Sequence, residues 1–144
     1  MNLPDKIYES ITLLSEEGNA LYDESAFEGA ISKWSQALNL LPTPQASWEA
    51  STWLSASIGD AFFQLGQYSK SLENLKDALN GPDGLDNSFI HYRIGQCQTL
   101  LGFDDEAITS LLKAYMLDGD AVFKTDPDGE VYLQKLKVQH LIDD

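Results

Sequence analysis

Apolar residues recur every three or four positions along most of this 144-residue chain, which is the spacing typical of amphipathic α-helices. Short segments rich in Gly, Pro, Asp and Asn separate these stretches, and such residues end helices. The pattern predicts an all-α chain. Its expected helices are Leu3–Leu21, Phe27–Leu41, Gln45–Leu65, Ser69–Leu79, Ser88–Leu101, Glu106–Leu117 and a last one from about Glu130.

Three pairs of these helices share one register of small residues. In each pair a Gly is followed twelve residues later by a small residue and nineteen residues later by an Ala. The three sets are Gly18, Ala30 and Ala37; Gly59, Ser71 and Ala78; and Gly95, Ala107 and Ala114. Two helices cross tightly only where small side chains let the backbones approach each other. The register therefore predicts three helix hairpins of one design.

This pattern resembles the tetratricopeptide repeat (TPR), a helix-turn-helix unit with a period near 34 residues. The resemblance implies an all-α, TPR-type α-solenoid of three repeats with a C-terminal capping helix, because a repeat stack leaves an open apolar end. We expect a single domain over residues 1–144. Its repeats are expected at about 8–42, 46–82 and 87–119, and its capping segment at about 121–144.

The spacing between the repeats is uneven. Gly18 and Gly59 are 41 residues apart, whereas Gly59 and Gly95 are 36 apart, so the excess lies between the first two repeats. We expect the extra residues to lengthen the helix from Gln45 at its N-terminal end. Trp48 and Glu49 are then expected to project beyond the first repeat.

Charge limits the kind of partner. The chain has 23 acidic and 9 basic residues, a net charge of −14. Such a surface repels nucleic acid and anionic membranes and attracts basic partners, although solubility alone also explains it. No apolar run approaches the ~18 residues of a membrane span, and the lone Cys97 suits a reducing cytoplasm. We expect a cytoplasmic protein that binds neither nucleic acid nor membranes.

Motifs for catalysis are missing from the sequence. His91 and His140 lie far apart, and we find no nucleophile-elbow Ser, phosphate-binding Gly loop or Cys/His metal-ligand spacing. The aspartates near the C-terminus lack the ligand spacing and closing Glu of a calcium loop. These aspartates are Asp118, Asp120, Asp126 and Asp128. We therefore expect no enzymatic activity, no cofactor and no metal.

The resemblance, rather than the spacing, assigns a binding surface, because the first helix of each TPR pair lines the concave face. The matching positions are Asn19, Tyr22, Asp23, Trp53, Asp60, Phe63, Gln64, Phe89, Tyr92, Gln96 and Thr99, with Trp48 and Glu49 beside them. Aromatic rings among carboxylates and amides suit a protein partner that presents Lys or Arg. Phe63 and Tyr92 fit a core position as well as a lining position.

One use of the TPR fold is disfavoured here. Chaperone-adaptor versions clamp an acidic C-terminal peptide with Lys, Arg and Asn side chains. Asn19 is kept in this sequence, but Asp60 and Gln96 stand at equivalent places, and Arg93 is the only basic residue nearby. An acidic peptide would be repelled.

Several stretches resemble a narrower group, the small bacterial TPR proteins found beside polymorphic toxin genes, some of which act as immunity proteins. These stretches include Trp34-Ser-Gln-Ala-Leu-Asn-Leu-Leu-Pro-Thr-Pro, Ile58-Gly-Asp-Ala-Phe-Phe and Leu79-Asn-Gly-Pro-Asp-Gly. Together with the negative charge, the resemblance implies a protein that binds and neutralises a basic toxin domain. We expect a monomer or a weak homodimer, the latter through Trp48 and the helix from Gln45. A general TPR adaptor, scaffold or secretion chaperone remains the alternative, and its binding would survive high salt better.

Overall fold

The computed structural model describes residues 2–143, and within this range the chain forms helices and no β-strand. The α-helices are α1 (Asp5–Asp23), α2 (Phe27–Asn39), α3 (Glu49–Gln64), α4 (Tyr68–Leu79), α5 (Ser88–Leu100), α6 (Asp104–Asp118) and α7 (Gly129–Val138). Three short 3-10 turns, η1 (Gln45–Ser47), η2 (Gly84–Asp86) and η3 (Val122–Lys124), lie between them. The all-α prediction is confirmed.

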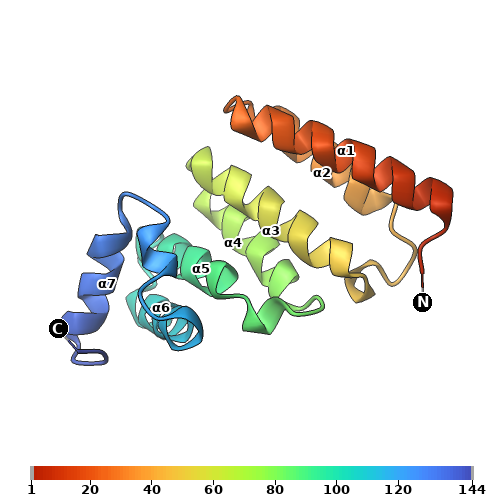
Figure 1. Cartoon of the computed structure of the whole chain (residues 1–144). Helices are drawn as coiled ribbons and strands as arrows, with labels where there is room; N and C mark the ends of the chain where they lie inside the picture. Colours follow the sequence, from red (N-terminus) through yellow and green to blue (C-terminus); the bar gives the residue numbers. More distant parts are fainter. Residues whose placement is uncertain (1, 144) are drawn as a thin grey trace. The chain divides into compact units, whose positions relative to one another are not determined.

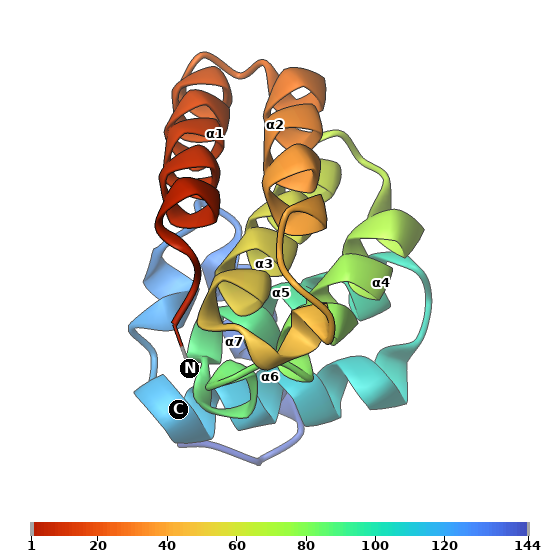
Figure 2. The same cartoon turned by 90° about the vertical axis from the view of Figure 1, so that its right-hand side faces the viewer.

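The chain divides into two compact units, residues 1–84 and 85–144. The N-terminal unit contains two antiparallel hairpins, α1 with α2 and α3 with α4 (Figure 1). The C-terminal unit contains the hairpin of α5 and α6, together with η3 and α7. Figure 2 shows α1 and α2 side by side, joined by the short turn that follows Asp23.

Helix contact in the N-terminal unit depends on two glycines. A Cβ at Gly18 would lie 2.5 Å from the indole Nε1 of Trp34, and one at Gly59 would lie 2.7 Å from Cγ of Leu75. The hydroxyl of Ser71 also donates a 2.6 Å hydrogen bond to the carbonyl of Gly59. The small residues of the repeat register therefore lie where the paired helices approach most closely, as the sequence predicts.

The C-terminal unit repeats this contact and adds a cover. A Cβ at Gly95 would lie 2.7 Å from Leu111, so α5 and α6 also meet at a glycine. The core of this unit then extends into η3 and α7. Its buried members are Tyr92, Leu111, Ala114, Val122, Phe123, Tyr132, Leu133 and Leu136. The segment predicted as a cap is thus built into the core of the unit.

The start of the third helix differs from the prediction. Instead of one helix from Gln45, the chain forms η1, passes through extended backbone at Trp48 (φ −94°, ψ 140°) and begins α3 at Glu49. The indole N–H of Trp48 donates a 2.9 Å hydrogen bond to the carbonyl of Pro42, and the ring packs against the core of the N-terminal unit. The expectation that Trp48 projects beyond the first repeat is wrong, because this bond turns the ring back.

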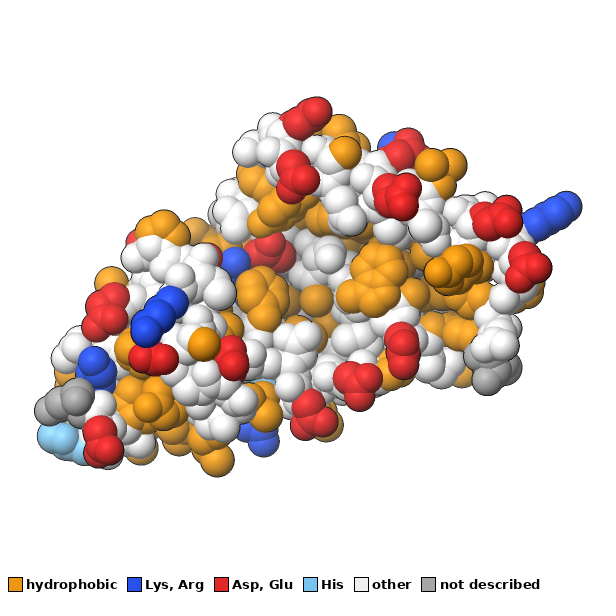
Figure 3. Space-filling model, in the orientation of Figure 1, with side chains coloured by type: hydrophobic (Ala, Val, Ile, Leu, Met, Phe, Trp, Pro, Cys, Tyr) orange, Lys and Arg blue, Asp and Glu red, His pale blue; other side chains and the backbone are white. Residues whose placement is uncertain are grey.

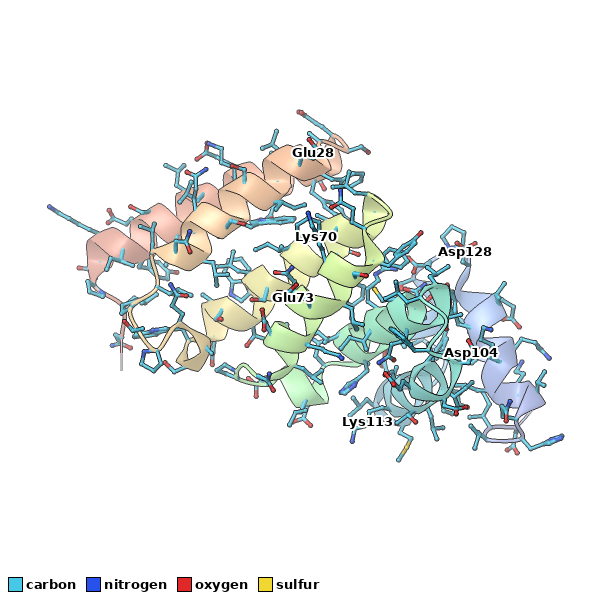
Figure 4. All side chains as sticks on the ribbon, turned by 180° about the vertical axis from the view of Figure 1, so that it is seen from behind. Glu28, Lys70, Glu73, Asp104, Lys113 and Asp128 are labelled. Carbon is cyan, nitrogen blue, oxygen red and sulfur yellow. The ribbon has the colours of Figure 1, made fainter. Side chains whose placement is uncertain are left out.

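Acidic residues stand at the beginnings of helices in the C-terminal unit. Asp104 opens α6, and Asp128 precedes α7 (Figure 4). A carboxylate at a helix N-terminus interacts favourably with the helix dipole. Part of the excess negative charge therefore stabilises local structure.

Replacing Gly59 with Ala should destabilise the N-terminal unit by about 1–2 kcal/mol, because overpacking against Leu75 exceeds the gain in helix propensity. The free energy of unfolding in urea measures the effect. Ser69→Ala, at an exposed position of the same hairpin, is the control and should change stability by less than about 0.5 kcal/mol. Equal stability of both variants would contradict a tight approach at residue 59.

Candidate functional site

A groove of about 1010 Å³ lies in the N-terminal unit, between the first half of α1 and the start of α3. We call it the α1–α3 groove. Its lining combines aromatic rings with carboxylates. The aromatic members are Tyr8, Trp48 and Trp53, and the acidic members are Asp5, Glu16 and Glu49.

The aromatic side chains of the α1–α3 groove face solvent to different degrees. Tyr8 is 61% exposed and Trp53 is 43% exposed, whereas Trp48 is half-buried and held by its bond to Pro42. Figure 3 shows hydrophobic side chains gathered in the hollow of the N-terminal unit, with Asp and Glu on both sides. Among residues 2–143, none that lines the groove is Lys or Arg. The groove therefore offers apolar surface in a negative field.

A smaller pocket of about 200 Å³ lies in the same unit, lined by Asn19, Tyr22, Asp23, Trp34, Ser57 and Asp60. We call it the Asp60 pocket. The hydroxyl of Tyr22 donates a 2.5 Å hydrogen bond to the carboxylate of Asp60, and the indole of Trp34 donates a 3.3 Å hydrogen bond to Asn19. These bonds join α1 and α2 to each other and α1 to α3. The structure thus brings together four of the predicted lining residues.

Two predicted residues at the end of α3 lie outside both cavities. The ring of Phe63 is partly buried, with its centroid 5.4 Å from that of Tyr68 at the start of α4. Gln64 is exposed at the last position of the helix. Neither lines the α1–α3 groove or the Asp60 pocket.

The C-terminal unit buries two of the residues that were predicted to line its surface. Tyr92 is fully buried, and Gln96 is 1% exposed. The ring of Tyr92 meets those of Phe123 and Tyr132 edge to face, with centroid distances of 5.0 and 6.2 Å. The prediction that Tyr92 and Gln96 contact a partner is therefore corrected, because η3 and α7 occupy that face of α5.

Asp126, between η3 and α7, adds a charged contact between this covering segment and α5. Its carboxylate accepts hydrogen bonds from Arg93 at 2.7 Å and from the amide of Gln96 at 3.2 Å. Arg93 also donates a 2.6 Å bond to the amide oxygen of Gln96. Burial, and next the nearby Asp126, raise the pKa of the Tyr92 hydroxyl, which therefore stays protonated. The arrangement gives the buried guanidinium of Arg93 an acidic partner within its own unit.

Two predicted residues of this face remain, and the first of them, Phe89, is half-buried. The guanidinium of Arg93 lies 5.0 Å from its ring centroid, a distance that allows a cation–π interaction. Thr99 is partly buried and donates a 2.9 Å hydrogen bond to the carbonyl of Gly95 in its own helix. Both residues thus interact with their own helix.

Comparison with solved structures identifies the fold. The chain is similar to the C-terminal TPR-containing domain of a putative FK506-binding protein from Plasmodium falciparum, with a TM-score of 0.76, 20% identity and 98% of each chain covered. It is also similar to the Arabidopsis OM64 TPR domain, with a TM-score of 0.72, 18% identity and 92% and 98% coverage. The chain has the fold of a TPR domain. No protein-family model and no curated protein matches this sequence.

A third similar structure is the second TPR domain of human RPAP3 in complex with the HSP70 peptide SGPTIEEVD. It matches with a TM-score of 0.71 and 18% identity over 91% of this chain and 98% of that one. At these identities the likeness establishes the TPR fold alone. The link to immunity proteins stays a prediction from the sequence.

Two residues with a defined structural place, Tyr8 at the groove and Asp126 beside Arg93, are absent from the binding surface predicted from the sequence. Tyr8 stands one turn into α1, ahead of the first repeat's small residues, and only its helical spacing from Ile11 and Thr12 could place it beside the groove. In the sequence, Asp126 stands out only as one of four aspartates that lack the spacing of a calcium loop.

The part of the chain that the structure describes holds no group of three His, Cys, Asp or Glu side chains placed for a metal. Nor does it hold a helix long and apolar enough to cross a membrane.

Removing the hydroxyl of Tyr22 should destabilise the N-terminal unit. We expect Tyr22→Phe to lower the free energy of unfolding by about 1–2 kcal/mol, because Asp60 loses a hydrogen bond that its half-buried carboxylate accepts. Urea denaturation measures the change. Tyr8→Phe is the matched control, since its ring is 61% exposed, and a loss as large in Tyr8→Phe would rule out the Tyr22–Asp60 bond as the cause.

Neutralising Asp126 should destabilise the C-terminal unit more strongly than Tyr22→Phe destabilises the N-terminal unit. Asp126→Asn removes the carboxylate charge that pairs with the buried guanidinium of Arg93 at 2.7 Å, so we expect a loss of about 2–4 kcal/mol. Asp120→Asn is the control, because the ion pair of Asp120 with Lys124 lies on the surface, with side chains 55% and 72% exposed. Its loss should lower stability by less than about 1 kcal/mol. Thermal denaturation of both variants compares them. A stable Asp126→Asn protein would show that the ion pair is dispensable.

Proposed function

We propose that this TPR domain is a non-catalytic protein-interaction module whose binding surface lies in the N-terminal unit. The observation that supports this best is the α1–α3 groove, where the exposed rings of Tyr8 and Trp53 lie among carboxylates. Large aromatic side chains are enriched at the energetic centres of protein interfaces. The complex of the similar human domain with an HSP70 peptide adds a precedent for the fold.

The negative charge of the α1–α3 groove makes an acidic peptide like that of the human complex an unsuitable ligand for this chain. The peptide SGPTIEEVD ends in acidic residues. The α1–α3 groove carries Asp5, Glu16 and Glu49, and the Asp60 pocket adds Asp23. A negative groove repels an acidic peptide and attracts a basic one. The proposed partner is therefore a protein with an exposed basic surface.

Within this class we propose that the partner is a bacterial toxin domain and that the chain acts as its immunity protein. The resemblance of the sequence to TPR proteins found beside polymorphic toxin genes supports this, as does the net charge of −14. Many such toxins are nucleases or other enzymes with basic clefts. Carboxylates that pair with the Lys and Arg of a cleft would exclude its substrate. The cytoplasm, where such a toxin acts, is the proposed location.

A general adaptor, scaffold or secretion chaperone is the competing proposal. Such a protein would bind peptides of several partners in the same groove, through apolar contacts more than through charge. Salt distinguishes the two, because screening weakens exposed charge pairs and leaves apolar burial intact.

The proposed function is tested by capturing partners with tagged protein from the lysate of its own organism, at low and at high salt. We expect one basic protein, bound in equal amounts and weakened at least about tenfold in affinity between 50 and 500 mM salt. The purified pair should reproduce this in titration calorimetry, and co-expression should protect cells from the partner's toxicity. Several unrelated partners that bind equally at both salt concentrations would contradict the immunity proposal and favour the adaptor.

A further inference from the structure

We infer that the α1–α3 groove binds a short peptide segment of the partner in which one large apolar side chain is flanked by Lys or Arg. The inference rests on the proposed function and names the chemistry of the ligand. It depends on three features of the N-terminal unit. These are the size of the groove, the fixed position of its walls and the pairing state of its carboxylates.

The size of the groove fits a few side chains. A volume of about 1010 Å³ is at the upper end of the range for pockets that hold drug-sized ligands. Trp53 on α3 and Tyr8 on α1 both line this space and are partly exposed to solvent. An aromatic or long aliphatic side chain can therefore enter between the two helices, whereas a folded domain cannot.

The walls of the groove are held in place before any ligand binds. The hydrogen bond to Pro42 fixes Trp48 at the point where α3 begins. Four residues further along the chain, the hydroxyl of Thr52 donates a 2.9 Å hydrogen bond to the carbonyl of Pro82, which also lines the groove. Ordering a side chain on binding costs free energy, so a fixed wall favours affinity.

The carboxylates at the groove are available for a partner. Within residues 2–143, neither Asp5, Glu16 nor Glu49 forms an ion pair with a Lys or Arg, although the neighbouring Glu17 pairs with Lys33 at 3.2 Å. All three carboxylates belong to exposed residues. A Lys or Arg on either side of the apolar anchor would therefore find a carboxylate without displacing a bond of the chain. An acidic segment would meet like charge on α1 and on α3.

The experiment selects peptides of about twelve residues from a random phage-displayed library on the full chain. Fluorescein-labelled synthetic copies of the enriched peptides are then titrated by fluorescence anisotropy. We expect the enriched sequences to share one aromatic or long aliphatic residue with Lys or Arg near it. Trp53→Ala and Tyr8→Ala should each weaken binding by at least about tenfold, and Met116→Ala, an exposed apolar residue of the other unit, by less than about twofold.

A charge-matched pair of variants tests the electrostatic part. Asp5→Lys with Glu49→Lys reverses two charges at the groove, and Glu28→Lys with Glu73→Lys reverses two exposed charges outside it, on α2 and α4 (Figure 4). The net charge changes equally in both double variants. We expect the first to weaken binding at least about tenfold and the second to weaken it less than about threefold at 0.15 M salt.

Three results would overturn the inference: no enriched peptide, enrichment of acidic peptides, or binding that Trp53→Ala leaves unchanged. A dimer of the chain in sedimentation that Trp53→Ala dissociates would also overturn it, because a second copy would then fill the groove. These failures differ from failure of the proposed function. If the captured protein partner still binds the Trp53→Ala variant, the interaction module stands and the groove is not its site.

Discussion

Close approach of paired helices at a glycine is the contact on which the rest of the structure depends. It occurs at Gly18 against Trp34, at Gly59 against Leu75 and at Gly95 against Leu111. A Cβ at any of these positions would force the facing side chain, or its helix, to shift. Because each glycine fixes one face of the first helix against the second, the remaining faces of α1 and α3 are left for the α1–α3 groove and the Asp60 pocket.

Helix pairing could be predicted from the sequence because it depends on local spacing, and the structure confirms the helices except at the start of α3, where η1 and Trp48 replace four predicted helical residues. The site was only partly predictable. Asn19, Tyr22, Asp23 and Asp60 come together because they share the register of the repeats. Tyr92 is buried by Phe123 and Tyr132, which lie 31 and 40 residues later, and no local pattern encodes such a contact. The position of the Trp48 ring depends on one hydrogen bond to the carbonyl of Pro42 across a loop. Helix propensities of single residues carry no information about such a bond.

The two units use their acidic residues in different ways. In the N-terminal unit, carboxylates at the groove stay exposed to solvent, and Asp60 is held by a neutral hydroxyl. In the C-terminal unit, Asp126 neutralises Arg93, which is the only Arg of the chain. The guanidinium that a TPR domain could present to an anionic ligand is thereby used within the fold. Because this pair is neutral overall, the negative sign of the accessible surface follows from the composition, with 23 acidic and 9 basic residues.

The cover that η3 and α7 place over α5 also has an evolutionary consequence. Residues such as Tyr92, Gln96 and Asp126 serve the stability of their own unit, so a substitution at one of them must be matched by the others. Exposed positions on α1 and α3, such as Tyr8 and Trp53, carry no comparable constraint from the fold. A lineage that changes its partner is therefore expected to diverge along the first and third helices while the inner face of the fifth helix stays constant.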